Sequence, residues 1–119
     1  MTVTIYGIKN CETMKKARPW LDKHGVAYDF HDYKSAGIER ERLERWEKRV
    51  GWEKLLNRSG MTFRNLSDKD KTGLDVNKAL ALMLAKPSMI KRPVLDLGGG
   101  KLLVGFTPEL YAEKLAARN

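Results

Sequence analysis

TIYGIKNCETMKKARPWLDKHGVAYDF, residues 4–30, changes its hydrophobic period twice, and these changes indicate the topology of the first part of the chain. Alternating side chains predict a strand over residues 2–6 and a second one over about residues 26–31. Apolar residues spaced three or four apart predict a helix over about residues 12–24. Because the connection between the strands is short, we expect a parallel, right-handed βαβ unit.

Two residues bear on the shape of this helix. Gly25 directly follows its last turn and is placed to cap the C-terminus. Pro19 lies inside the helix, where it removes a hydrogen bond, and therefore predicts a kink or an early break.

The middle of the chain has helical periodicity instead of strand alternation. After a turn at Ser35-Ala36-Gly37, we expect a helix over about residues 39–49, a short helical piece near 51–56 and another helix over about 75–85. The polar residues 57–73 between them predict a loop.

The last part of the chain returns to strands. RPVLDLGGGKLLVGF, residues 92–106, predicts a hairpin whose glycine-rich centre forms the turn. Thr107 is a suitable N-cap for a closing helix, and Pro108 suits its first position. The complete order is the thioredoxin-like arrangement: an α/β fold of βαβ and ββα halves around a mixed four-stranded sheet. We expect one domain, residues 1–119, with a helical insertion at about 35–88.

Composition excludes several classes of function. No stretch of about 18 apolar residues could span a bilayer, and no signal peptide is visible, so we expect a cytoplasmic protein with no membrane partner. A monomer is the default expectation. The net charge is +8, but much of it lies in ERERLERWEKRV, residues 39–50, where the signs alternate. This is typical of a solvated helix face, and no nucleic-acid partner is expected. His24 and His31 lack ligand spacing, so no metal site is predicted.

Cys11 is the only cysteine, which excludes an internal disulfide. It precedes the first predicted helix, where unpaired N–H groups and the positive end of the helix dipole favour a thiolate. Lys9, Lys15 and Lys16 add positive potential, and Glu12 opposes it. The alternative is that Cys11 is a small hydrophobic residue used for packing.

Arg92-Pro93, directly before the third predicted strand, is a second candidate element. A cis bond here would leave the preceding backbone free to pair with an extended ligand. If Arg92 points to Cys11, it would both stabilise the thiolate and hold an anionic group such as a glutathione carboxylate.

Five segments together resemble the arsenate reductase-like family of thioredoxin folds, specifically its YffB-type branch, which is related to the redox regulator Spx. They are TIYGIKNCETMKKARPWL (4–21), FHDYKSAGI (30–38), GWEKLLNRSGMTFRNL (51–66), IKRPVL (90–95) and LLVGFTPELY (102–111). The resemblance implies a glutathione-dependent monothiol reductase without a bound cofactor, in which glutathione is the co-substrate and thiol or disulfide compounds are the substrates. It implies Cys11 as the nucleophile and Arg92, beside a cis Pro93, as the residue that holds an anion. Lys9 and Asn10 are candidate ligand contacts.

The departures from the family pattern decide between the family's activities. Gly7 occupies the position of the arsenate reductases' histidine, and Asn57 that of their middle arginine, with Arg58 one step on and a further candidate for substrate binding. Their last arginine falls at or near Gly105, so arsenate reduction is not expected. Met14 stands where Spx-like regulators have a second cysteine. A non-catalytic binding protein, with RNA polymerase as partner by analogy with Spx, remains the alternative.

Overall fold

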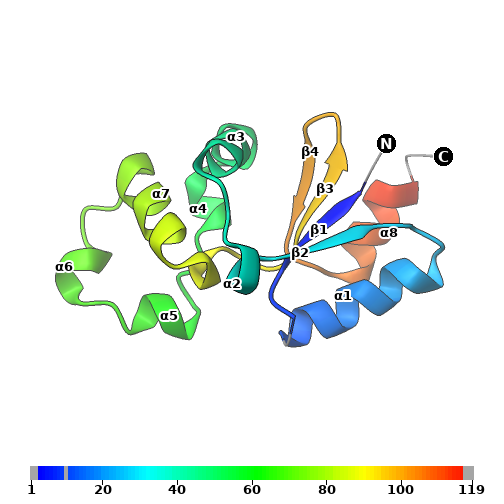
Figure 1. Ribbon diagram of the computed structural model, residues 1–119, viewed down its shortest axis with the longest axis horizontal. Coiled ribbons are helices and arrows are strands. Elements are labelled where there is room, and N and C mark those ends of the chain that lie inside the picture. The colour runs from blue at the N-terminus through cyan, green and yellow to red at the C-terminus, as the bar shows by residue number, and fades with distance from the viewer. Residues whose placement is uncertain (1–2, 10, 117–119) are drawn as a thin grey trace. The chain divides into compact units, whose positions relative to one another are not determined.

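The computed structural model describes residues 3–9 and 11–116. The chain forms two compact units, one made of Met1–His31 and Arg92–Asn119 and the other of Asp32–Lys91 (Figure 1). The predicted helical insertion at about 35–88 falls within the second unit. That residues 1–119 constitute a single domain stays a prediction.

The first unit is built on a mixed four-stranded sheet in the order β2-β1-β3-β4. Its strands are β1 (Thr4–Gly7), β2 (Asp29–Asp32), β3 (Val94–Gly98) and β4 (Lys101–Val104). The β1·β3 and β3·β4 pairs are antiparallel, with Ile5 opposite Leu95 and Leu95 opposite Leu103. The predicted α/β class with a thioredoxin-like sheet is confirmed.

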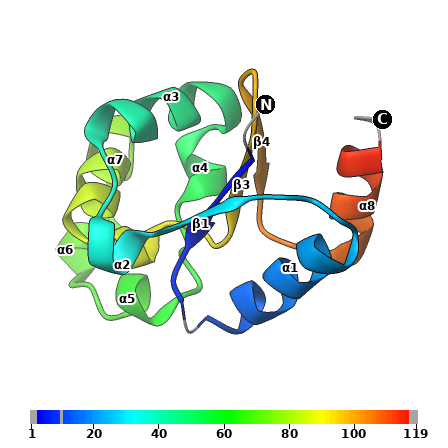
Figure 2. The ribbon, with the colours of Figure 1, turned by 45° about the vertical axis from the view of Figure 1, so that its right-hand side comes forward.

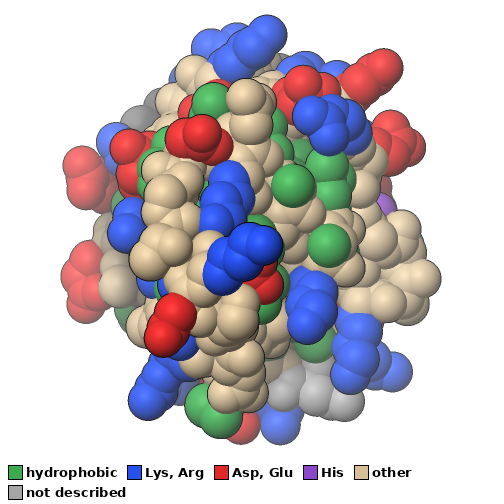
Figure 3. All heavy atoms as spheres, turned by 90° about the vertical axis from the view of Figure 1, so that its left-hand side faces the viewer, with side chains coloured by type: hydrophobic (Ala, Val, Ile, Leu, Met, Phe, Trp, Pro, Cys, Tyr) green, Lys and Arg blue, Asp and Glu red, His purple; other side chains and the backbone are tan. Residues whose placement is uncertain are grey.

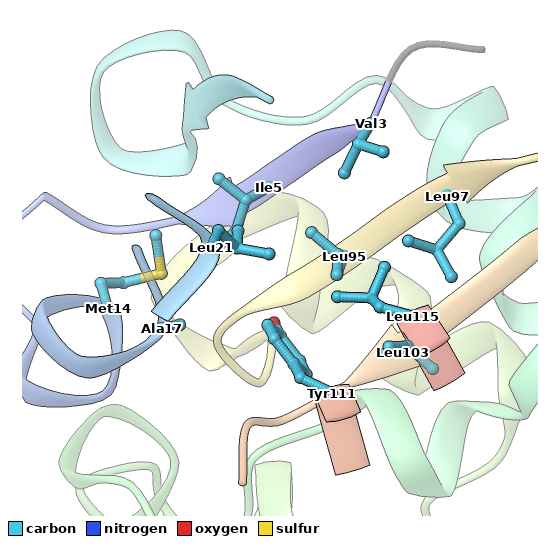
Figure 4. Packing of buried hydrophobic residues seen from close by; sticks show 10 residues of the cluster. All are labelled: Val3, Ile5, Met14, Ala17, Leu21, Leu95, Leu97, Leu103, Tyr111 and Leu115. Carbon is cyan, nitrogen blue, oxygen red and sulfur yellow. The ribbon is translucent and has the colours of Figure 1, made fainter. Parts of the chain in front are cut away.

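Helices α1 (Glu12–Lys23) and α8 (Pro108–Ala116) cover one face of this sheet (Figure 2). Side chains from the strands and from both helices meet in one apolar layer (Figure 4). Complete burial of a large apolar side chain contributes about 1.5–3 kcal/mol, so this layer holds α1 and α8 against the sheet. Its buried members are Val3, Ile5, Met14, Ala17, Leu21, Leu95, Leu97, Leu103, Tyr111 and Leu115.

Helix α1 continues through Pro19 to Lys23, so the expectation of an early break is wrong. Pro19 is exposed, and the apolar stripe on the opposite side keeps the helix on the sheet. The helix ends as predicted, with Gly25 in the left-handed region at φ 69°. The N–H groups of Gly25 and Val26 donate to Asp22 and Leu21 at 3.2 and 2.9 Å, which satisfies two carbonyls of the last turn.

The sequence also predicts the start of β2 and the cap of α8 in the first unit. Strand β2 starts at Asp29, later than predicted, although Val26, Tyr28 and Phe30 do pack against the core. The capping of α8 is confirmed, because the N–H of Leu110 donates to Thr107 Oγ1 at 3.0 Å.

The second unit is helical. It contains α2 (Tyr33–Ala36), α3 (Arg40–Val50), α4 (Trp52–Leu55), α5 (Met61–Arg64), α6 (Asp68–Lys71), α7 (Val76–Ala85) and the 3-10 turn η1 (Pro87–Met89). Its buried side chains include Leu43 and Trp46 from α3 and Leu80 and Met83 from α7. An isolated antiparallel bridge joins Leu56 to Ile90.

The prediction of a loop over residues 57–73 is wrong in part, because α5 and α6 lie within it. Helix α5 is anchored by buried Phe63, and α6 is capped by Ser67 Oγ, which accepts from the N–H of Asp70 at 3.3 Å. Single helical turns have too few residues for a periodic pattern, so a cap and one apolar anchor were the available signals. The turn at residues 35–37 likewise includes the end of α2, and Gly37 has φ 68°.

Candidate functional site

Cys11 is the N-cap residue of α1, with extended backbone angles of φ −83° and ψ 136°. Its carbonyl accepts the first helical hydrogen bond, from Lys15 at 3.0 Å, and its own N–H donates to Ile8 at 3.2 Å. The side chain is half-buried and packs against the core of the first unit. The structure therefore holds this thiol at the open end of α1, neither sealed in the core nor fully exposed.

The surroundings of Cys11 lower the pKa of its thiol below the ordinary value, even though burial alone would raise it. A hydrogen bond from the Arg92 side chain is the largest lowering influence. The main-chain N–H groups of Met14 and Thr13 follow, and the positive charge of Arg92 adds to them. The two N–H groups point at the sulfur without forming a cap hydrogen bond of standard geometry. Both belong to the first turn of α1, where N–H groups without a helical partner stabilise an anion.

Arg92 reaches Cys11 because it lies two residues before β3, the strand next to β1. The Arg92-Pro93 peptide bond is cis. Pro93 is buried, and its carbonyl accepts from the N–H of Gly105 at 2.9 Å. Arg92 is half-buried, so its guanidinium acts where water screens charge less than at an open surface.

The other candidate residues are placed less closely. Lys9 is exposed in the turn between β1 and α1. Asn10 lies outside the described residues. Arg58 belongs to the second unit, where its guanidinium carbon lies 5.4 Å from the centroid of the Trp52 ring. Of the predicted residues, Arg92 lies against Cys11, whereas Arg58 packs against the Trp52 ring.

Gly7 and Met14 are packed against each other beside the thiol. A Cβ atom at Gly7 would overlap Met14 Sδ and would lie 3.0 Å from Met14 Cε. Met14 is fully buried. A side chain at position 7 therefore requires the Met14 side chain to move. Sequence reasoning noted both residues as departures from a family pattern, but it missed that they depend on each other, because no local pattern connects a strand end to a helix interior.

No group of three or more His, Cys, Asp or Glu side chains placed to hold a metal ion occurs in residues 3–9 and 11–116. No helix in that part of the chain is long and apolar enough to cross a membrane. On the face drawn in Figure 3, Lys and Arg side chains are interspersed with Asp and Glu side chains, and Arg40 pairs with Glu44 at 3.7 Å. The absence of metal and nucleic-acid partners stays a prediction.

Comparison with known proteins places this arrangement in a family. The sequence model of the ArsC family matches residues 6–114, which include Cys11 and Arg92. The chain belongs to the ArsC family. A solved structure named YFFB (PA3664) protein is 62% identical, with a TM-score of 0.90 over 94% of this chain and 97% of that one. An ArsC-related protein from Brucella melitensis is 56% identical, with a TM-score of 0.78 over 97% and 95%.

Other relatives of this chain differ in what their names state. An uncharacterized protein of Haemophilus influenzae is 40% identical over 96% of this chain and 99% of its own length. The global transcriptional regulator Spx of Streptococcus mutans is 26% identical over 90% of this chain and 78% of its own length. The relatives of this chain thus include both an ArsC-related protein and a transcriptional regulator.

Proposed function

We propose that this ArsC-family protein is a glutathione-dependent monothiol reductase in which Cys11 is the nucleophile. The observation that carries the proposal is the half-buried thiol at the start of α1, whose pKa is lowered chiefly by the hydrogen bond from Arg92. A thiolate, not a thiol, attacks disulfides, so a lowered pKa increases the reactive fraction at neutral pH.

The proposed reaction has two exchanges. The Cys11 thiolate attacks the glutathione sulfur of a mixed disulfide, the bond between Cys11 and glutathione forms, and the substrate leaves as a thiolate that takes up a proton. The thiolate of a second glutathione then attacks the glutathione sulfur of this adduct. Oxidised glutathione leaves, and the Cys11 thiolate is restored. No second cysteine exists in the sequence to take over this step.

Arg92 has two roles in this proposal. In the free protein its guanidinium stabilises the Cys11 thiolate, and in the adduct, where the sulfur is neutral, the same group becomes available to a glutathione carboxylate. Lys9 is exposed one position beyond Ile8 and is proposed to contact the other carboxylate. Asn10, Pro93 and Arg58 remain proposed ligand contacts.

The proposal is tested by incubating the protein with oxidised glutathione at neutral pH and measuring its intact mass. We expect one glutathionyl group per chain, located on Cys11 by peptide mapping and removed by reduced glutathione. Cys11→Ser should gain none, and Arg92→Gln should gain it more slowly. Absence of an adduct on the wild-type protein would overturn the proposal.

Arsenate is not the proposed substrate. An oxyanion site is strengthened by several charged donors, each worth about 1.5–3 kcal/mol. The resemblance places such donors at positions that here hold Asn57 and Gly105. The histidine position is Gly7, where a side chain would have to displace Met14.

The second candidate function is a regulatory binding protein, favoured by the similarity to Spx. RNA polymerase is the partner to test under this alternative. Met14 leaves no partner for a disulfide with Cys11, so binding would not be switched in that way. The alternative gains if Cys11→Ser still binds polymerase while the wild-type protein forms no glutathione adduct. A cytoplasmic location and a monomeric state belong to either proposal.

A further inference from the structure

An open groove on the first unit lies outside the site described above. It runs between α1, which contributes Arg18 and Asp22, and residues 26–30, which lead into β2, and its volume is about 440 Å³. Strand β2 is at the edge of the sheet, with β1 as its neighbour on one side. The groove therefore lies beside a strand whose outer side is unpaired within the sheet.

Arg18 lines this groove and contacts two aromatic side chains there. Its Nε donates to Tyr28 Oη at 3.2 Å, and its guanidinium carbon lies 4.4 Å from the centroid of the Phe30 ring. Within residues 3–9 and 11–116, its two terminal amino groups donate no hydrogen bond and form no ion pair. A planar guanidinium that is held in place through its Nε, and whose two terminal amino groups have no hydrogen-bond partner, is suited to bidentate binding of a carboxylate.

The main chain of β2 offers a second set of contacts. The N–H of Asp29 donates to Val3 at 2.9 Å, so Asp29 directs its backbone groups toward the β1 side. Successive residues of a strand direct their N–H and C=O groups to opposite sides. Those of Phe30 therefore face the open edge, where an extended peptide can pair with them.

The groove is aligned with the thiol along α1. Arg18 follows Cys11 by seven residues, which is nearly two turns, so both lie on the same side of the helix about 10 Å apart. An extended peptide covers about 10 Å in three residues. A peptide whose cysteine lies at Cys11 thus places its third neighbour at Arg18.

We propose that this groove binds the protein portion of a mixed disulfide, an inference that rests on the proposed reductase function. The occupant is an extended segment paired with the edge of β2. It carries one Asp or Glu about three residues from its glutathionylated cysteine, and that carboxylate binds Arg18. Asp22 and Asp29 line the same groove, so a single carboxylate fits, and a run of acidic residues is disfavoured.

The test uses two synthetic peptides, each with one glutathionylated cysteine. One peptide has Glu three residues before and three residues after this cysteine, and the other has Gln at both positions. For the wild-type protein we expect kcat/KM about tenfold higher with Glu, equivalent to about 1.4 kcal/mol, and carried by a lower KM. Arg18→Gln should bring the ratio close to one, and Arg18→Lys should restore part of it. Lys23→Gln, which removes the same charge from an exposed position of α1, should leave the ratio unchanged.

Two further measurements separate this inference from the proposed function. The first is reduction of the mixed disulfide of glutathione and 2-mercaptoethanol, which is too small to occupy the groove. The second is binding of the same peptides with serine in place of cysteine. Reduction of the small substrate with no Glu preference overturns the groove assignment alone. An Arg18-dependent Glu preference in binding, without any reduction, supports the groove and overturns the reductase proposal.

Discussion

Replacement of Gly7 by alanine tests the packing that places the start of α1. Gly7 has no positive φ, so alanine is allowed by the backbone, and the whole cost is steric. The added Cβ would overlap Met14 Sδ and lie 3.0 and 3.1 Å from Met14 Cε and Cγ. Overpacking a fully buried side chain in this way costs about 1–3 kcal/mol. We expect the free energy of unfolding to fall by this amount, which appears as a lower urea midpoint with an unchanged slope.

A double-mutant cycle isolates the steric interaction between positions 7 and 14. Met14→Ala alone should lower the free energy of unfolding by about 2–5 kcal/mol, because it leaves a cavity in the core. In Gly7→Ala/Met14→Ala the new methyl group occupies part of that cavity and no longer meets sulfur. The double variant should therefore be more stable than the sum of the single effects predicts, by about 1 kcal/mol or more.

The same cycle has a chemical readout. The main-chain N–H of Met14 is one of the groups that lower the pKa of Cys11, so a displaced Met14 should slow alkylation of the thiol at neutral pH. The double variant should recover part of that rate. Additive free energies of unfolding, within about 0.5 kcal/mol, would refute the steric coupling of Gly7 and Met14.

Three other predictions concern single side chains. Arg92→Ala should slow alkylation of Cys11 at neutral pH about tenfold, and Arg92→Lys should have an intermediate rate. The reason is that a charged hydrogen bond at a half-buried site is worth about 1.4 kcal/mol, near the lower end of its range. An unchanged rate would show that Arg92 does not act on the sulfur. Tyr111→Phe should keep or raise thermal stability, because the buried Tyr111 hydroxyl finds no hydrogen-bond partner among the described residues, and a loss above about 1 kcal/mol would contradict this. Thr107→Ala should cost about 1 kcal/mol in urea unfolding through loss of the Leu110 contact, whereas Thr107→Ser should cost little.

Much of the fold could be predicted because its signals are local. The apolar period of α1, the left-handed Gly25 after it and the cap at Thr107 each follow from a few neighbouring residues. The short helices α5 and α6 could not be predicted from periodicity, because a four-residue turn contains only one apolar anchor or none. Their stability comes from tertiary packing and caps.

The candidate site was predictable to a different degree. The position of Cys11 before a helix favours a thiolate by local physics, and the lowered pKa agrees with it. The contact of Arg92 with Cys11 joins residues that are 81 positions apart (92 − 11), so it depends on strand order. The Gly7–Met14 packing and the position of Arg18 on Phe30 likewise depend on side-chain positions that no pattern in the sequence specifies.

The central claim is that the surroundings of Cys11 lower the pKa of its thiol, and the pH dependence of its alkylation tests this most directly. The rate with iodoacetamide follows the thiolate fraction, and Cys11 is the only thiol in the chain. Because its pKa is lowered, the rate should reach half its maximum below the ordinary thiol value of about 8.5. A half-maximum at or above about 8.5 would contradict the account.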